Sequence, residues 1–327
     1  MTKKTIKNIG VFTSGGDSPG MNAAIRAVVR SALYYDVKVT GILRGYDGMI
    51  GGEFVPMERK SVANIIQRGG TILKTARSDE FHTVEGRKKA FEQLKLNEID
   101  ALVAIGGDGT FTGANIFYDE YKVPVIGLPG TIDNDLLGTD FTIGYDTAIN
   151  TVIQAVDKIR DTAESHDRLF IVEVMGRDSG FIALRSGIGT GAEAILIPET
   201  KTDIKALLAR LEMSRKDKSS KIIIVAEGDD AGGAFEIAKS VKEKFPLIDT
   251  RVSVLGHIQR GGAPSCMDRV LASRLGVAAV ESLIEGKTGE MIGIVNGKIH
   301  FTPFGQAIKH NTDVNKELLK IVDILSL

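Results

Sequence analysis

Two carboxylates and a threonine lie within five residues, directly after an apolar run. The segment reads Gly127-Leu-Pro-Gly-Thr-Ile-Asp-Asn-Asp135, so Asp133 and Asp135 closely follow Thr131. The run at 123–128 is typical of a buried strand, and ligands of open α/β sheets bind beyond the carboxyl ends of strands. A carboxylate placed there can accept a proton from an attacking hydroxyl. The alternative is an Asx-rich surface turn, which an Asp-Asn-Asp triplet also favours.

Two glycine-rich turns earlier in the chain could bind phosphate. The apolar run at 9–13 ends in Ser14-Gly-Gly-Asp17, and the run at 100–105 ends in Gly106-Gly-Asp-Gly-Thr110. Each turn precedes a segment of helical composition, and a strand, turn and helix in this order aim backbone N–H groups at phosphate. Asp108 suits Mg²⁺, which takes one or two carboxylates together with phosphate oxygens. Asp17 is equally suited to capping the helix that follows it.

The second half of the chain places different side chains after its apolar runs. These are Met175 to Arg177, Glu227, and His257 to Arg260. Arginine binds phosphate and neutralises charge on a transferred phosphoryl group, although a single arginine is more often a solvated surface residue. His257 is equally compatible with a position in the core. Together with the glycine turns, these residues indicate phosphoryl transfer from a nucleotide to a small anionic acceptor.

Apolar runs alternate with helical segments along the whole chain, which predicts an α/β fold with largely parallel sheets. The length of 327 residues favours two domains. A net charge of −1 provides no basic field for nucleic acid, and no apolar run approaches the length of a membrane span. Cys266 is the only cysteine, which excludes an intramolecular disulfide and is typical of a reducing compartment. We therefore expect a soluble, cytoplasmic protein.

Five blocks of the sequence resemble the bacterial 6-phosphofructokinase family, in the family's order. They are Thr13-Ser-Gly-Gly-Asp-Ser-Pro-Gly-Met-Asn22, Ile105-Gly-Gly-Asp-Gly109, Pro129-Gly-Thr-Ile-Asp-Asn-Asp135, Glu173-Val-Met-Gly-Arg177 and Gly256-His-Ile-Gln-Arg-Gly-Gly262. The resemblance implies phosphorylation of fructose 6-phosphate at its 1-hydroxyl by ATP with Mg²⁺, the committed step of glycolysis. It also implies two α/β domains with the active site in the cleft between them. The ATP-binding domain would hold 1–143 plus 256–306, and the sugar-phosphate-binding domain 144–255 plus 307–327.

The resemblance also implies a role for individual residues. Asp133 would take the hydroxyl proton, with Thr131 and Arg177 beside the transferred phosphoryl group. The residues that would bind ATP are Gly16, Arg77, Ser78, Gly107, Asp108, Gly109 and Thr110, with Asp108 also binding Mg²⁺. Those that would bind the sugar phosphate are Thr131, Ile132, Asp133, Met175, Gly176, Arg177, Glu227, His257, Ile258, Gln259 and Arg260. Arg168 and Arg251 would reach its 6-phosphate from a neighbouring subunit, and Asp135 receives no role beyond turn structure.

A homotetramer with an effector site between subunits is a further implication of the resemblance. ADP or GDP would activate the enzyme there, and phosphoenolpyruvate would inhibit it. The matching residues are Arg26, Arg30, Arg59, Arg160, Gly191, Glu193, Lys216 and Lys218. Arg26 and Arg30 lie four residues apart in a predicted helix, so that spacing alone places them on one face. Lys216 and Lys218 depend on a one-residue gap in the alignment of 210–220.

The phosphoryl donor can be inferred from Gly109 and Gly130. Pyrophosphate-using relatives carry Asp at the first position and Lys at the second, whereas glycine at both leaves room for a full nucleotide and predicts ATP. A lipid or NAD kinase is an alternative, since both use Gly-Gly-Asp-Gly-Thr before a helix. Neither accounts for 129–135 together with 256–262. A nucleotide-sensing subunit without catalysis is the other alternative, and it should have lost at least one of Asp108, Asp133 and Arg177.

Overall fold

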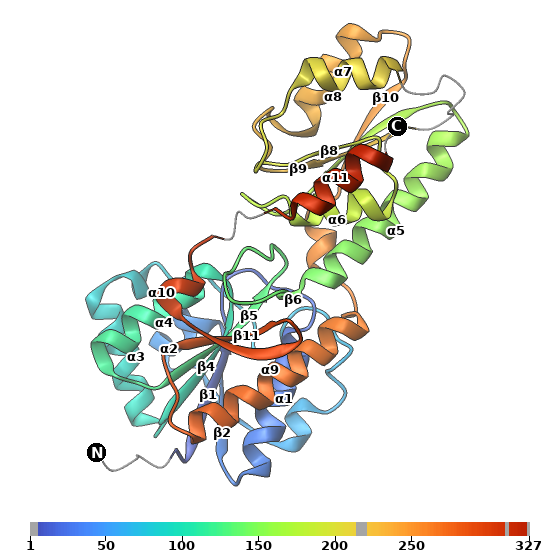
Figure 1. Ribbon diagram of the computed structural model, residues 1–327. Coiled ribbons are helices and arrows are strands. Elements are labelled where there is room, and N and C mark those ends of the chain that lie inside the picture. Colours follow the sequence, from blue (N-terminus) through green and yellow to red (C-terminus); the bar gives the residue numbers. More distant parts are fainter. Residues whose placement is uncertain (1–5, 214–220, 311–313, 326–327) are drawn as a thin grey trace. The chain divides into compact units, whose positions relative to one another are not determined.

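The computed structural model describes residues 6–213, 221–310 and 314–325. The chain separates into two compact units, each built on its own sheet (Figure 1). Unit 1 comprises Met1–Ile132, Leu136–Thr147 and Arg260–Asn311, and unit 2 comprises Asp133–Asp135, Ala148–Gln259 and Thr312–Leu327. The predicted α/β fold with largely parallel sheets is confirmed.

Unit 1 contains an eight-stranded sheet among the described residues. Its strands are β1 (Asn8–Thr13), β2 (Lys38–Ile42), β3 (Phe54–Met57), β4 (Ala101–Gly106), β5 (Val125–Thr131), β6 (Ile143–Gly144), β11 (Glu290–Val295) and β12 (Lys298–Pro303). The order is β12-β11-β5-β4-β1-β2-β3, with β6 paired to β5. The inner strands are parallel, and only the edge strands β3 and β12 pair antiparallel with their neighbours.

Helices cover both faces of this sheet because side chains alternate along each strand. Val103 of β4 packs with α1 (Met21–Tyr34) and α9 (Cys266–Ile284). Ala104, the next residue, lies in the cluster formed with α2 (Gly45–Gly51), α3 (Val84–Leu96), α4 (Asp108–Tyr121) and α10 (Phe304–Ala307) on the other face (Figure 1). α1 and α9 approach closely, since a Cβ at Gly276 would lie 2.5 Å from the Cβ of Ala27.

The four-stranded sheet of unit 2 is parallel throughout. Its order is β10-β7-β9-β8, formed by β7 (Leu169–Val174), β8 (Ala194–Leu196), β9 (Lys221–Ala226) and β10 (Thr250–Val254). Apolar residues of α7 (Ile204–Met213) and α8 (Gly233–Lys244) pack on one face. α6 (Phe181–Gly189) and α11 (Lys316–Leu325) lie on the other face, with α5 (Tyr145–Glu164) beside them (Figure 1).

Three short 3-10 helices complete the described elements: η1 (Arg59–Val62), η2 (Glu80–His82) and η3 (Gly256–Arg260). Among the helices that the structure describes, none combines the length and the apolar character needed to cross a membrane.

Candidate active site

The two glycine turns lie side by side at the carboxyl ends of neighbouring strands. β1 and β4 pair directly, while the helix after β1 packs on one face of the sheet and the helix after β4 packs on the other. Ligands of open α/β sheets bind at this kind of topological switch point. Ser14 N donates to Ile105 O at 3.0 Å, and Thr110 Oγ1 donates to Ser14 O at 3.1 Å. Hydrogen bonds therefore join the two turns directly at the carboxyl ends of β1 and β4.

Glycine is required where these turns touch. A Cβ at Gly106 would lie 2.2 Å from Thr110 Oγ1 and 2.6 Å from Ser14 O, distances that real Cβ atoms do not adopt. Gly109 is different, because no atom lies within 4 Å of a Cβ built there. Gly130 is different again, since its Cβ would contact Ile105 at 3.0 Å and Met21 at 3.1 Å. Close packing is thus a second reason for glycine at 130, whereas packing gives no reason for glycine at 109.

Asp108 is the first residue of α4 and is half-buried at the turn. Over the described ranges 6–213, 221–310 and 314–325, no three His, Cys, Asp or Glu side chains gather as a metal-binding group. Mg²⁺ bound with a nucleotide does not need such a group, because one carboxylate, phosphate oxygens and waters complete its six positions. A single acidic side chain beside a glycine-rich turn therefore fits this metal.

Arg77 and Ser78 lie just before η2, on a segment that is fixed to the first turn of α4. The ring of Phe81 stacks on Tyr46 with a centroid separation of 3.9 Å and an interplanar angle of 17°. The hydroxyl of Tyr46 donates to Thr110 O at 2.6 Å, and burial raises the pKa of this phenol well above its usual value. Sequence reasoning missed Tyr46, although it follows a strand end in the turn Arg44-Gly-Tyr-Asp-Gly48.

The carboxyl end of β5 contributes Thr131, beside β4 in the sheet. A Cβ at Gly107 would lie 3.6 Å from the Cβ of Thr131, and Thr131 O accepts a hydrogen bond from Thr142 Oγ1 at 2.6 Å. Arg260 lies at the β1 turn, where its Nη1 donates to Asp17 O at 3.1 Å. The structure thus places Arg260, which the resemblance assigns to the sugar phosphate, against Gly16, which the resemblance assigns to ATP. Ile132 is buried.

In unit 2, Asp133 and Arg177 are brought together. The Nε of Arg177 lies 3.9 Å from Asp133 Oδ2, and the side chain of Asp133 is 5% exposed while that of Arg177 is 48% exposed. Ser179 Oγ donates to Asp133 O at 3.1 Å. The pairing places one positive charge, open to solvent on its other side, against a buried carboxylate.

The turn that carries Arg177 is held by Glu227. Gly176 and Arg177 have φ values of 147° and 51°, in the left-handed region. Glu227 Oε1 accepts hydrogen bonds from the backbone N–H of Gly176 at 3.2 Å and of Arg177 at 2.8 Å. A carboxylate that accepts both bonds stabilises a turn whose conformation is costly for a residue other than glycine.

η3 is attached to the end of β7 through Gln259. Its Oε1 accepts from Met175 N at 3.3 Å, and its Nε2 donates to Gly256 O at 3.0 Å. Gln259 is fully buried, whereas His257 and Ile258 are exposed. The alternative of a core position for His257 is therefore wrong.

Arg168 and Arg251 converge on a residue that sequence reasoning missed. Arg168 Nε lies 2.7 Å from Asp249 Oδ2, and Arg251 Nε lies 2.9 Å from Asp249 Oδ1. The hydrogen bond from Arg168 and, to a smaller extent, that from Arg251 lower the pKa of Asp249. The parallel pairing of β10 with β7, which places Thr250 opposite Leu169, brings the two arginines to the same sheet edge.

The residues matched to the effector site fall into two sets. Arg26, Arg30 and Arg59 belong to unit 1, where burial and the neighbouring charge of Arg30 lower the pKa of Arg26. Arg59 also lines an open hollow of about 460 Å³ with Leu33, Glu58 and Lys60. Arg160, Gly191 and Glu193 belong to unit 2, where Arg160 donates to Thr190 O. Lys216 and Lys218 lie outside the described residues.

Comparisons with known proteins agree with the resemblance. The family model for phosphofructokinase matches residues 8–283. The chain is 56% identical over 322 residues to the ATP-dependent 6-phosphofructokinase of Cytophaga hutchinsonii, with 98% of each chain covered. It is 57% identical over 323 residues to ATP-dependent 6-phosphofructokinase 1 of Thermus thermophilus, covering 98% of this chain and 100% of the relative.

Solved structures share the fold. The phosphofructokinase of Saccharomyces cerevisiae matches with a TM-score of 0.89 at 38% identity, over 98% of this chain and 47% of that one, so this chain spans about half its length. A pyrophosphate-dependent phosphofructokinase of Nitrosospira multiformis matches with a TM-score of 0.86 at 20% identity, over 98% and 92% of the two chains. On the family match and the near full-length identities, the chain belongs to the phosphofructokinase family.

Proposed function

We propose that this protein is an ATP-dependent 6-phosphofructokinase that transfers the γ-phosphoryl group of ATP to the 1-hydroxyl of fructose 6-phosphate. One observation carries the proposal: the turns after β1 and β4 adjoin, and β5, the next strand in the sheet, leads directly to Asp133. The relatives at 56% and 57% identity are ATP-dependent 6-phosphofructokinases, which supports ATP as the donor. In this proposal the enzyme acts in the cytoplasm.

Residues of unit 1 bind the nucleotide. Backbone N–H groups of 15–16 and 107–110 bind its phosphates, since glycine lets the main chain approach an anion closely. Arg77 and Ser78 lie on the segment attached to α4 and contact the nucleotide from the other side. Asp108 would hold Mg²⁺, which when bound neutralises charge on the transferred phosphoryl group.

Residues of unit 2 bind the sugar and perform the proton transfer. Asp133 accepts the proton of the 1-hydroxyl as that oxygen attacks phosphorus, and Arg177 at 3.9 Å neutralises negative charge beside it. Met175, Gly176, Glu227 and His257 to Gln259 surround the sugar phosphate, together with Arg260 of unit 1. Ile132 lies between Thr131 and Asp133 in the sequence, and its buried side chain anchors the segment that carries both residues.

Oligomerisation completes the sugar site in this proposal. Arg168 and Arg251, held together by Asp249, bind the 6-phosphate of a sugar on a neighbouring subunit of a homotetramer. The effector residues suit the same arrangement, because Arg26, Arg30 and Arg59 lie in one unit and Arg160, Gly191 and Glu193 in the other. Clustered arginines bind phosphorylated effectors such as ADP, GDP and phosphoenolpyruvate.

The identity of the phosphoryl donor distinguishes this proposal from its main alternative, an enzyme that uses pyrophosphate. Initial rates of fructose 1,6-bisphosphate formation should be measured with ATP and with pyrophosphate at equal concentrations. We expect turnover with ATP only, because the space at Gly109 accommodates the α-phosphate of a nucleotide. Faster turnover with pyrophosphate would overturn the donor assignment. Absence of turnover with either donor would favour a nucleotide-sensing protein instead.

A further inference from the structure

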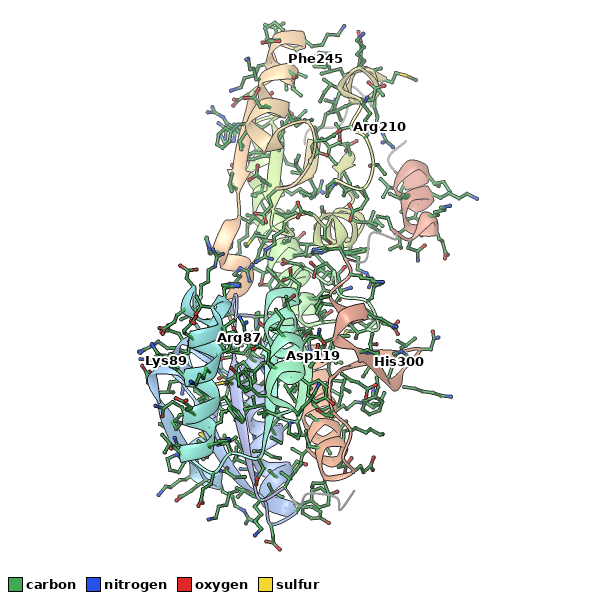
Figure 2. All side chains as sticks on the ribbon, turned by 90° about the vertical axis from the view of Figure 1, so that its left-hand side faces the viewer. Arg87, Lys89, Asp119, Arg210, Phe245 and His300 are labelled. Carbon is green, nitrogen blue, oxygen red and sulfur yellow. The ribbon has the colours of Figure 1, made fainter. Side chains whose placement is uncertain are left out.

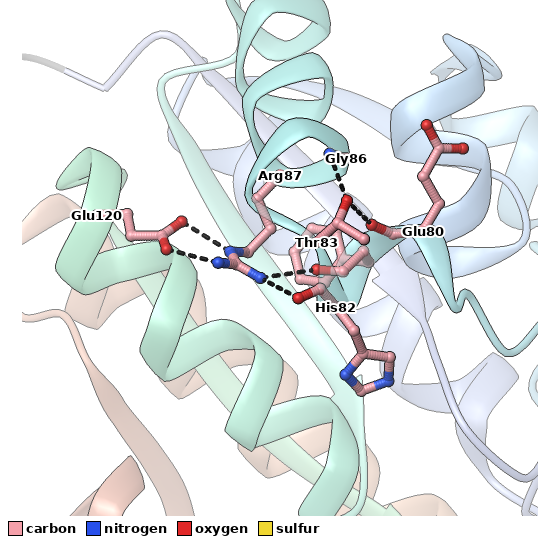
Figure 3. Close-up of polar contacts among 7 residues, drawn as sticks. Glu80, His82, Thr83, Gly86, Arg87 and Glu120 are labelled. Carbon is pink, nitrogen blue, oxygen red and sulfur yellow. Dashed lines mark hydrogen bonds and ion pairs between the residues drawn. The ribbon is translucent and has the colours of Figure 1, made fainter.

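Arg87 connects three parts of unit 1 (Figure 3). It lies on α3, is 7% exposed, and makes paired hydrogen bonds to Glu120 of α4. Its Nε donates to Glu120 Oε2 and its Nη2 to Glu120 Oε1, both at 2.7 Å. Its remaining terminal nitrogen, Nη1, donates to the carbonyl oxygens of Phe81 at 3.1 Å and His82 at 2.8 Å. One guanidinium group thus binds both α4 and the segment that follows Ser78.

Both partners stay ionised at neutral pH. The hydrogen bond from Arg87 lowers the pKa of Glu120, and the same bond raises the pKa of Arg87 against the opposing effect of burial. A bidentate arginine–carboxylate pair fixes orientation as well as distance, because its two N–H···O bonds are parallel. The contact is therefore directional and does not depend on pH in the physiological range.

The segment that Arg87 holds is also fixed along its length. Thr83 Oγ1 accepts from Gly86 N at 3.0 Å and donates to Glu80 O at 2.8 Å, which caps α3 and closes η2. A Cβ at Gly86 would lie 2.0 Å from Glu80 O, so the turn packs directly on the helix. At the other end, Phe81 N donates to Ser78 Oγ at 3.4 Å. A shift of the backbone at 81–82 would therefore also move Ser78 and Arg77.

We propose that Arg87 and Glu120 are positioning residues for the nucleotide. They fix Arg77 and Ser78 relative to the first turn of α4, where Asp108 to Thr110 lie, and they do not touch the nucleotide themselves. The inference rests on the proposed function, since that function assigns Arg77, Ser78 and 107–110 to ATP. It adds two residues that no motif contains.

A purely structural role would join α3 to α4 and no more. Apolar side chains perform that task as well, because replacing a buried ion pair with hydrophobic residues is often neutral for stability. Only a planar group with several donors can bind Glu120 and two loop carbonyls together. Figure 2 shows Arg87 between α3 and α4, while Lys89 of the same helix points away from α4. A positioning role requires the hydrogen bonds from Arg87 to the carbonyl oxygens of Phe81 and His82. A purely structural role does not require them.

Steady-state kinetics of Arg87→Leu test the proposal. We expect the KM for ATP to rise about tenfold or more, because a displaced Arg77 and Ser78 would lose hydrogen bonds, one of them charge-assisted, that bind ATP equally in the ground and transition states. The KM for fructose 6-phosphate and the kcat at saturating ATP should each stay within about twofold, since neither the base nor the sugar site moves. Arg87→Lys should be intermediate, because an ammonium group cannot bind all four acceptors.

Two further variants make the result interpretable. Lys88→Leu is the matched control, since Lys88 lies on the same helix, is 68% exposed and pairs only weakly with Glu92 at 4.0 Å. Its KM for ATP should equal that of the wild type. Glu120→Gln keeps the side-chain volume and should give a smaller rise than Arg87→Leu. It also serves as the test if Arg87→Leu fails to fold, which a thermal melt would show.

Arg77→Ala separates this inference from the proposed function. If Arg77→Ala raises the KM for ATP and neither Arg87→Leu nor Glu120→Gln does, the nucleotide site stands and the positioning role is overturned. If Arg87→Leu lowers kcat and leaves the KM for ATP unchanged, the positioning role is also overturned. A rise in the KM for ATP in Arg77→Ala, Arg87→Leu and Glu120→Gln, with Lys88→Leu unchanged, supports it.

Discussion

The two units expose different chemistry at the ends of their strands. In unit 1 the carboxyl ends of β1 and β4 present backbone, because the turns that follow them are glycine-rich and Gly106 has no room for a Cβ. In unit 2 the strand ends present charged side chains: Arg177, held by Glu227, follows the carboxyl end of β7, whereas Arg168 and Arg251, held by Asp249, lie at the amino ends of β7 and β10. The contrast predicts that the strand ends of unit 1 are sensitive to added volume, and those of unit 2 to removed charge.

The largest effect should come from Asp133, the proposed general base. Asp133→Ser removes the proposed proton acceptor, and we expect kcat to fall about 10²–10⁴-fold, the usual contribution of a general base. The KM for fructose 6-phosphate should change little, because the arginines proposed to bind its phosphate remain. Initial rates over a range of fructose 6-phosphate concentrations measure both parameters.

Asp135→Ser is the neighbouring control for this experiment. Asp135 is buried in the same segment, and we expect its loss to leave kcat far higher than the loss of Asp133. Circular dichroism should show that both variants are folded. If the two substitutions lower kcat equally, the base is misassigned.

Added volume in unit 1 should have the next largest effect. Gly106→Ala forces a Cβ against Thr110 Oγ1 and Ser14 O, and overpacking of this kind costs about 1–3 kcal/mol of unfolding free energy. Because it separates the two turns proposed to bind phosphate, the KM for ATP should rise as well. Urea unfolding and ATP titration measure the two effects.

Gly109→Ala is the matched test, with an expected effect of opposite sign on stability. A Cβ there meets no atom within 4 Å, and replacing glycine by alanine inside a helix stabilises it by roughly 0.5–1 kcal/mol. The KM for ATP should still rise if the open space belongs to the nucleotide. Equal losses of stability in the two variants would contradict the comparison of these positions.

Loss of the carboxylate that orders Arg168 and Arg251 should have the smallest effect. Asp249→Asn weakens the group that orders Arg168 and Arg251, and we expect the KM for fructose 6-phosphate to rise about two- to tenfold, the cost of ordering one or two long side chains. The KM for ATP should not change. A fall in the KM for fructose 6-phosphate would show that Asp249 competes with the substrate phosphate instead of arranging its ligands.

The positions of the strand ends could be predicted from the sequence, but the order of the strands in the sheet could not. The apolar runs at 9–13 and 100–105 correspond to β1 and β4, and the family resemblance is confirmed by the family match. Strand order depends on tertiary packing, so the direct contact between the two glycine turns came only from the structure. The residue-level roles assigned by the resemblance remain predictions.

Long-range partners were also beyond the reach of sequence patterns. Arg260 bonds to Asp17, 243 residues away, and Arg87 bonds to Glu120, 33 residues away. Neither pair shares a motif or a helical spacing. Asp249 escaped notice because its role follows from the register of β10 against β7, which no local signal specifies.

The contrast between Gly109 and Gly130 bears on how a lineage could exchange its phosphoryl donor. A Cβ can be added at 109 without contacting any neighbour, whereas one at 130 would lie 3.0 Å from Ile105 and 3.1 Å from Met21, so that these two side chains must shift slightly. A first step at 109 would thus require no adjustment around the added Cβ, and one at 130 would favour compensating changes nearby. Descendants that switch donor should therefore carry altered residues around Ile105 and Met21, as a historical trace of the second step.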